Sequence, residues 1–240
     1  MKLRFDCSTC ERPQSGVAAR FLGQVVDVND KGIYDVTCPR GHQVRYIIAN
    51  PRHAILFDAA ALAFVSGFYR ESVATFACSL ERALEHFTRW AARLSGVPDI
   101  EFTRAWTFSA KQTERQLGMF LFAHLALCRT SPAFSRRELE ELAARRNAVV
   151  HAGAIVDRKA AEQFATEVYN VIAALESSLH DFAGAAYSKQ TLRQWEEILL
   201  SEEEGATLVM YPLLLVGASQ DDDFRARLRR FEDENIWIRG

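Results

Sequence analysis

The chain has 240 residues, of which 49% are hydrophobic and 25% are charged, and its net charge is −2. This composition predicts a globular protein of one or two domains, and it excludes a nonspecific nucleic-acid binder that relies on a global basic excess. We see no signal-peptide pattern and no apolar run of the ~18 residues needed to span a bilayer. Because the number of cysteines is also odd, five, we expect a cytoplasmic protein without a membrane partner.

Residues 1–52 differ in pattern from the rest of the chain. Their short β-prone stretches, separated by glycine-containing segments, lie at residues 17–28, 33–37 and 43–48. The sequence Asn29-Asp30-Lys31-Gly32 is a strong turn signal between the first two stretches. We therefore predict a small β-rich module here.

Four residues of this module are candidate metal ligands. Cys7 and Cys10 form a Cys-x-x-Cys pair, and Cys38 and His42 flank a proline and a glycine that suit a tight turn. Thiolates and imidazole are the ligands that tetrahedral zinc prefers. The pattern resembles a zinc ribbon with three cysteines and one histidine, and its four filled positions imply a structural Zn²⁺. A chance Cys-x-x-Cys or a redox pair is the alternative, although the βαβ context of a thioredoxin-like motif is absent.

From about residue 54 the apolar residues recur at three- and four-residue spacing, which is typical of helices. The predicted helices span residues 68–94, 103–129, 135–151 and 158–182. Ser135 and Glu138 form a capping-box signal at the start of the third helix, and Gly153 is a natural stop after it. Four helices with short connections predict an antiparallel bundle over residues 53–185. We expect a solvated Glu81 on this bundle, and buried side chains at Cys78, His86, His124 and Cys128.

The C-terminal segment, residues 186–240, has a mixed pattern. Residues 191–200 and 221–231 look helical, whereas residues 207–216 include the apolar run of a buried strand. We expect this segment to extend the bundle domain. The predicted fold class is therefore mainly α, with a small N-terminal β-rich module and a mixed C-terminal segment.

The third predicted helix ends with a motif that could carry chemistry. His151 lies about 140° around the helix from Arg146 and ~7.5 Å further along its axis, and Asn147 follows the arginine directly. The pattern Arg146-Asn147-x-x-x-His151, late in the third helix of a four-helix domain, resembles the motif of HEPN-domain ribonucleases. The resemblance covers about residues 55–183 and includes the long first helix.

The resemblance implies a HEPN-like fold and a metal-independent endoribonuclease, acting on RNA as a toxin or an antiviral-defence effector. Family members are typically homodimers whose two motifs face each other, so we expect a homodimer. In cleavage through the RNA 2′-hydroxyl, His151 would transfer the proton and Arg146 would stabilise the developing phosphate charge. Asn147 would orient the phosphate or the imidazole. The zinc ribbon would recognise RNA or a trigger, and an antitoxin or a defence-system protein would be a further partner.

The motif also has a simpler interpretation. Arg146 could be a surface residue and His151 a helix terminator, and Ala152 and Gly153 follow where family members often carry a tyrosine. The chain would then be a catalytically silent HEPN-like dimeric scaffold or a nucleotide-binding module. In either case nucleic-acid contact would depend on local basic patches. These lie at Arg136, Arg137, Arg145 and Arg146, and between residues 225 and 230.

Overall fold

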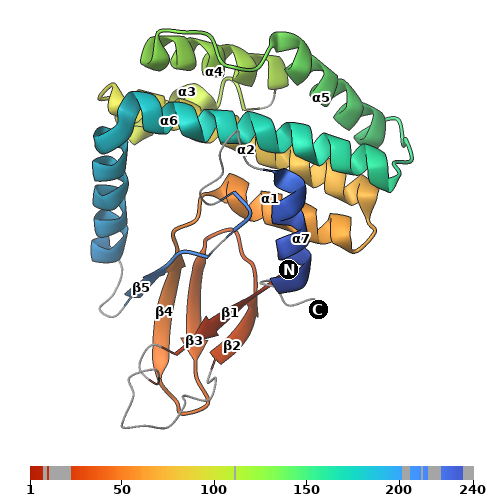
Figure 1. The fold of residues 1–240 in the computed structure, drawn as a ribbon. Helices are drawn as coiled ribbons and strands as arrows, with labels where there is room; N and C mark the ends of the chain where they lie inside the picture. Colours follow the sequence, from red (N-terminus) through yellow and green to blue (C-terminus); the bar gives the residue numbers. More distant parts are fainter. Residues whose placement is uncertain are drawn as a thin grey trace. The chain divides into compact units, whose positions relative to one another are not determined.

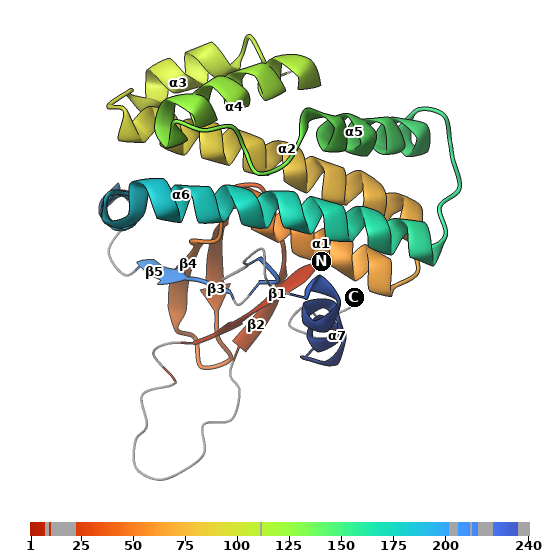
Figure 2. The same ribbon diagram turned by 45° about the horizontal axis from the view of Figure 1, so that its top comes forward.

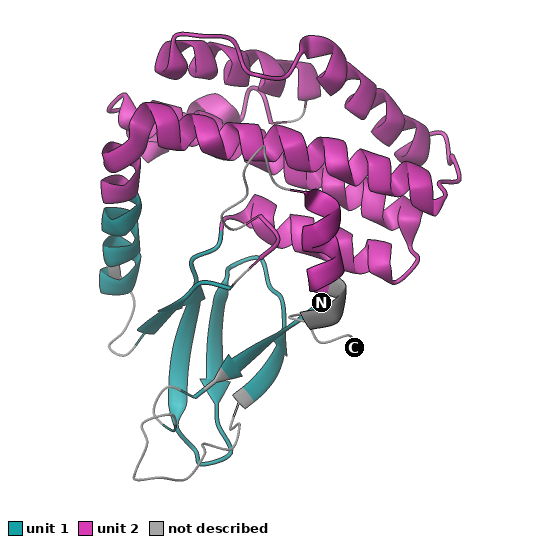
Figure 3. Cartoon of the chain, viewed as in Figure 1, with its two compact units in different colours: residues 1–50, 191–212, 233–240 teal, residues 51–190, 213–232 magenta. Residues whose placement is uncertain are grey.

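The computed structural model is mainly helical, with short strands near the N-terminus and one near the C-terminus, as the sequence predicts. It describes residues 1–7, 10, 23–110, 112–201, 206–211, 213–215 and 223–234. The chain forms two compact units (Figure 3). The first comprises residues 1–50, 191–212 and 233–240, and the second comprises residues 51–190 and 213–232. The residues after position 190 are therefore shared between the two units.

The first unit contains two small sheets (Figure 1). β1 (Lys2–Asp6) pairs antiparallel with β2 (Gly23–Asp27). β3 (Ile33–Thr37) pairs antiparallel with β4 (Gln43–Ile48), and β5 (Ala206–Val209) adds to β4 in parallel. The strands predicted at residues 33–37 and 43–48 are confirmed, whereas β1 was not predicted. The predicted stretch 17–28 is described only from residue 23 onward, where it forms β2; its first part lies outside the described residues.

The turn predicted between β2 and β3 is present. Asn29 Oδ1 accepts hydrogen bonds from the backbone N–H groups of Lys31 (3.0 Å) and Gly32 (2.9 Å). Gly32 has φ +68°, a conformation that favours glycine because it has no Cβ. The Asn29 N–H donates to the Tyr34 hydroxyl at 2.9 Å, which ties the turn to β3.

A small aromatic core holds the strands of the first unit together. Phe5, Tyr34 and Tyr46 are buried, and the rings of Phe5 and Tyr46 are stacked with centroids 4.8 Å apart. Successive strand residues point to opposite faces, so Arg45, next to Tyr46, pairs instead with Asp35 across the strands at 2.7 Å. The period of two in the sequence thus decides which side chains form the core.

The second unit is helical. Its helices are α1 (Arg52–Val65), α2 (Tyr69–Leu94), α3 (Asp99–Trp106), α4 (Thr113–Cys128), α5 (Arg136–Val150), α6 (Arg158–Ser201, of which residues 191–201 belong to the first unit) and α7 (Phe224–Glu234, up to residue 232). α2 is central, since it contacts α1, α3, α4 and α5, and α6 runs beside it in both views (Figures 1 and 2). Within the described parts of the chain, no helix is both long and apolar enough to cross a membrane.

The helix predicted over residues 103–129 is wrong, because two helices, α3 and α4, occupy this stretch. Side chains of α4 bond to backbone carbonyls of the connecting turn. Arg115 donates to the Phe108 carbonyl (3.1 Å), and Gln116 donates to the Ala110 carbonyl (2.8 Å). Such side-chain bonds compete with the helical ladder. Apolar periodicity carries no sign of them, and so it suggested one continuous helix.

The fourth predicted helix is longer than expected. α6 includes both residues 158–182 and residues 191–200, which were predicted as separate helices. It is interrupted at Gly184, where φ is 38° and ψ is −115°. Alanine stands on both sides of this glycine. Because alanine has the highest helix propensity, the helix resumes directly after the break.

The strand predicted over residues 207–216 is shorter than expected, since β5 ends at Val209. Beyond it, the side chain of Asn50 takes the place of a paired strand. Its amide nitrogen donates to the Tyr211 carbonyl (2.9 Å), and its oxygen accepts the Tyr211 N–H (2.7 Å). Residues 213–215 are buried in the second unit, where the Asp58 carboxylate on α1 accepts the Leu214 N–H at 3.0 Å.

We expect Asp58→Ala to destabilise the protein by about 1–3 kcal/mol, because it leaves the Leu214 N–H without this partner in a buried position. Asp58 is 0% exposed. Urea unfolding followed by circular dichroism would measure the change. As a control, Glu140→Ala removes a carboxylate that is 55% exposed and paired with Arg136, and it should change stability by less than about 0.5 kcal/mol. Equal stability of the two variants would contradict the role assigned to Asp58.

Candidate functional site

The four predicted metal ligands lie together in the first unit. The ligand atoms of Cys7, Cys10, Cys38 and His42 are all within 4.8 Å of one another. Cys10 Sγ is 3.7 Å from Cys38 Sγ, and His42 Nδ1 is 3.2, 3.5 and 3.8 Å from the sulfurs of Cys10, Cys38 and Cys7. Tetrahedral coordination at ~2.3 Å for sulfur and ~2.0–2.1 Å for nitrogen separates neighbouring ligands by about 3.6–3.8 Å. The cluster could therefore bind a metal ion.

Local turns bring each pair of ligands together. The Cys7 carbonyl accepts the Cys10 N–H at 3.0 Å just after β1. After β3, the Cys38 carbonyl accepts the Gly41 N–H (2.8 Å), and the Cys38 N–H donates to the His42 carbonyl (3.0 Å). Gly41 has φ +83°, which allows this turn without steric strain. The sequence pattern of the two pairs thus corresponds to two local structures.

The electrostatics of the thiols suit a bound cation. Burial, followed by the neighbouring thiols of Cys7 and Cys38, raises the pKa of Cys10 to about 11. At Cys38 burial also raises the pKa, but the backbone N–H groups of Arg40 and His42 outweigh it, so that the pKa falls to about 6. The Arg40 N–H lies 3.3 Å from Cys38 Sγ. A divalent cation would favour the thiolate form of all three cysteines.

The Arg–Asn–His motif lies at the C-terminal end of α5, in the second unit. Arg146 is partly buried: its Nη1 donates to Asn147 Oδ1 at 2.9 Å, and its Nη2 is 3.5 Å from Glu81 Oε1 on α2. His151 donates its backbone N–H to the Asn147 carbonyl (2.9 Å), and its side chain is exposed. Among the described residues, no hydrogen bond joins the side chains of Arg146 and His151. Glu81, expected on a solvated face, instead holds the arginine of the motif.

Comparisons with protein-family models, with curated proteins and with solved structures found no match. The HEPN resemblance therefore depends on the residues of the motif and on the helices that carry them. The predicted end of the third helix is confirmed, so the motif lies in the last turns of α5 as expected. The capping box of Ser135 and Glu138 begins α5, and Gly153 (φ +70°) follows its end.

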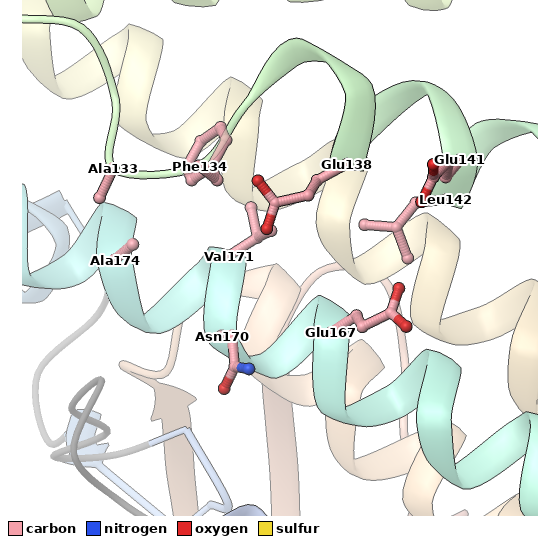
Figure 4. Close-up of a pocket in the computed structure, with 9 residues that line it drawn as sticks. All are labelled: Ala133, Phe134, Glu138, Glu141, Leu142, Glu167, Asn170, Val171 and Ala174. Carbon is pink, nitrogen blue, oxygen red and sulfur yellow. The ribbon is translucent and has the colours of Figure 1, made fainter.

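A groove of about 550 Å³ lies between α5 and α6 (Figure 4). Its polar lining comes mainly from three carboxylates, Glu138 and Glu141 on α5 and Glu167 on α6. Glu167 pairs with Arg145 and Glu141 pairs with Arg137, whereas Glu138 caps the start of α5 through Ser135. Carboxylates repel the phosphates of nucleic acids. None of the residues that line the groove is basic, so the groove offers no cationic partner to a phosphate.

The arginines expected to form basic patches are engaged in ion pairs. Arg136 pairs with Glu140 and Arg137 with Glu141, each at 2.7 Å, and the two arginine side chains are 81% and 87% exposed. In the C-terminal patch, the described pairs include Arg225–Glu162 and Arg229–Asp223. Exposed ion pairs contribute at most about 1 kcal/mol. A phosphate could therefore displace the carboxylates from Arg136 and Arg137.

We expect Cys38→Ser to remove about one metal equivalent per chain and to destabilise the strands of the first unit more than the helices of the second. The reason is that binding free energy at such a site contributes directly to local folding. Metal analysis and backbone hydrogen exchange would measure the two effects. Cys78 on α2 is exposed, so the buried side chain expected there is wrong. Cys78→Ser is therefore the matched control and should change neither. Unchanged metal content in Cys38→Ser would show that the cluster binds no metal.

Proposed function

We propose that the chain is a HEPN-type endoribonuclease, which cleaves RNA through the 2′-hydroxyl without a catalytic metal and acts as a toxin or an antiviral-defence effector. The observation that carries the proposal is the setting of Arg146. Its guanidinium is held between Asn147 and Glu81. His151, which is exposed, follows Arg146 by five positions in the sequence. Cleavage of a phosphodiester requires an oriented cation and a proton-transfer group.

The residues of the motif have complementary roles in this reaction. His151 accepts the proton of the 2′-hydroxyl, whose oxygen then forms a bond to phosphorus while the bond to the 5′-oxygen breaks. The leaving 5′-oxygen takes up a proton, and the products carry a 2′,3′-cyclic phosphate and a 5′-hydroxyl. Arg146 stabilises the negative charge of the phosphorane. Asn147, which accepts one N–H of Arg146, keeps the guanidinium in place.

A second copy of the chain completes the active site in this proposal. Arg146 and His151 point about 140° apart on one helix, so a site that uses both is best formed by two motifs facing each other. The apolar side chains next to His151 support such an interface. Val150 is 37% exposed and Ile155 is 99% exposed. Burying them against a symmetric copy would remove apolar surface from water.

Zinc is the ion that we propose for the cysteine cluster. Three thiolates and one imidazole in a tetrahedral arrangement are typical of structural zinc. With all four positions taken by protein, no position is left for a substrate. The ion would therefore stabilise the first unit, which has only a small core, and this unit would recognise RNA or an activating partner such as a defence-system protein or an antitoxin.

We expect Arg146→Ala to slow RNA cleavage ~10²–10³-fold and His151→Ala to slow it ~10²–10⁴-fold. The double variant should be hardly slower than either single one, because residues that act as a unit are not additive. Gel assays on total RNA, with detection of 2′,3′-cyclic phosphate ends and with and without EDTA over short times, would test this. Arg104→Ala is the control for loss of an exposed arginine, since Arg104 is 70% exposed and pairs with Glu101 on α3.

If His151→Ala cleaves RNA as fast as the parent protein, the ribonuclease proposal is wrong. The catalytically silent scaffold or nucleotide-binding module then takes its place. One observation favours that alternative: among the described residues, no hydrogen bond joins the side chains of Arg146 and His151. Binding of nucleotides to a protein without RNA cleavage would support it.

We expect Ile155→Asp to convert a dimer into a monomer and to abolish cleavage, because a buried charge at the interface is costly. Light scattering coupled to size exclusion at micromolar concentration would measure the mass. Phe122→Asp is the matched control, since Phe122 is also exposed, at 74%, but lies on α4. It should leave both mass and cleavage unchanged. A monomeric parent protein that cleaves RNA would rule out the composite site.

A further inference from the structure

A second group of metal-binding residues lies inside the helical unit. His53 on α1, His86 on α2 and Glu176 on α6 place their ligand atoms within 4.8 Å of one another. The three residues are far apart in the sequence and follow no recognisable spacing. The sequence therefore indicates nothing about this cluster beyond the burial expected for His86.

The contacts within this cluster are close and partly shielded from water. His53 Nε2 is 3.1 Å from Glu176 Oε1. The rings of His53 and His86 meet edge to face with centroids 4.9 Å apart, and Trp90 packs against His86. His53 is 2% exposed, whereas the Glu176 side chain is 21% exposed. Solvent thus reaches one side of the cluster.

The position of His53 is fixed independently of Glu176. Its backbone carbonyl accepts a hydrogen bond from the buried Ser79 hydroxyl of α2 at 2.8 Å. This bond ties the first turn of α1 to α2, seven positions before His86. The backbone segments that carry the His53 and His86 imidazoles are therefore already joined by a hydrogen bond between α1 and α2. A site of this kind is rigid before any ion binds.

An ion pair between His53 and Glu176 explains only part of this arrangement. His53 Nδ1 is buried and, among the described residues, has no hydrogen-bond partner. Leaving such an atom unsatisfied is destabilising. The ion pair also gives no role to His86.

We propose that His53, His86 and Glu176 form a second metal site, which takes a divalent first-row transition metal ion. Two imidazoles and one carboxylate are a common ligand set for such ions. Three protein ligands leave at least one coordination position for water, in contrast to the filled cysteine cluster. The ion would connect α1, α2 and α6 at one point.

This site is separate from the Arg–Asn–His motif. His86 follows Glu81, the partner of Arg146, by five positions, so the two side chains point about 140° apart around α2. Glu81 faces α5, whereas His86 faces His53 on α1. The metal site therefore goes beyond the ribonuclease proposal, and each can fail without the other.

Counting metal ions in the full-length protein tests the proposal. The protein is equilibrated with excess Zn²⁺, desalted and analysed by inductively coupled plasma mass spectrometry. We expect about two equivalents in the parent protein and about one in Glu176→Gln, which keeps the side-chain size but removes the charge of one ligand. His124→Gln is the matched control and should retain both ions. His124 is also a buried histidine of this unit, but its Nδ1 is 3.0 Å from the Thr130 carbonyl.

Replacing zinc with Co²⁺ separates the two sites. Cobalt in the cysteine cluster gives thiolate-to-metal charge-transfer absorption, whereas cobalt bound by histidine and glutamate gives only weak ligand-field bands. Cys38→Ser should lose the first signal and keep the second. One equivalent in the parent protein, or two in Glu176→Gln, would overturn the proposal. If Glu176→Gln does not fold, His86→Gln is measured in its place, and the count in the parent protein remains decisive.

Discussion

α2 packs against α1, α3, α4 and α5, so a polar side chain that is buried on α2 needs a hydrogen-bond partner. Ser72 and Ser79, both buried, donate to carbonyls of α1 at 2.9 and 2.8 Å. Glu81 forms an ion pair with Arg146 of α5, and the ring of His86 packs against that of His53 on α1. The position of each residue around the axis of α2 thus decides whether its polar side chain meets α1 or α5. Both candidate sites of the helical unit depend on this packing.

The first unit has a different physical basis. Its strands are short and its aromatic core is small, so apolar burial alone contributes little stability. Two further features constrain its backbone. Turns bring the four candidate metal ligands together, and the side chain of Asn50 pairs with the backbone of Tyr211. A bound ion would then contribute folding free energy directly. A bound ion would thus matter more to this unit than to the larger unit, which has an extensive apolar core.

Charge decides how a polyanion could reach the helical unit. The groove between α5 and α6 is lined by carboxylates, whereas Arg136 and Arg137 are exposed and held only by weak ion pairs. Phosphates would therefore approach along the exposed side of α5 toward His151. The apolar residues at the end of this helix favour a second copy of the chain there. Under the ribonuclease proposal, the active site would lie between two copies of the chain, so it would not require a cleft within one copy.

The sequence by itself determined the elements whose signals are local. The strands at residues 33–37 and 43–48, the capping box of α5 and the two metal-ligand pairs follow from alternation, side-chain capping and short spacing. Only the tertiary structure decided contacts between distant residues. Glu81 beside Arg146, Asp58 beside Leu214, and the joining of His53, His86 and Glu176 depend on how helices pack. Periodicity reports which face of a helix is apolar, but it carries no information on which helix that face meets.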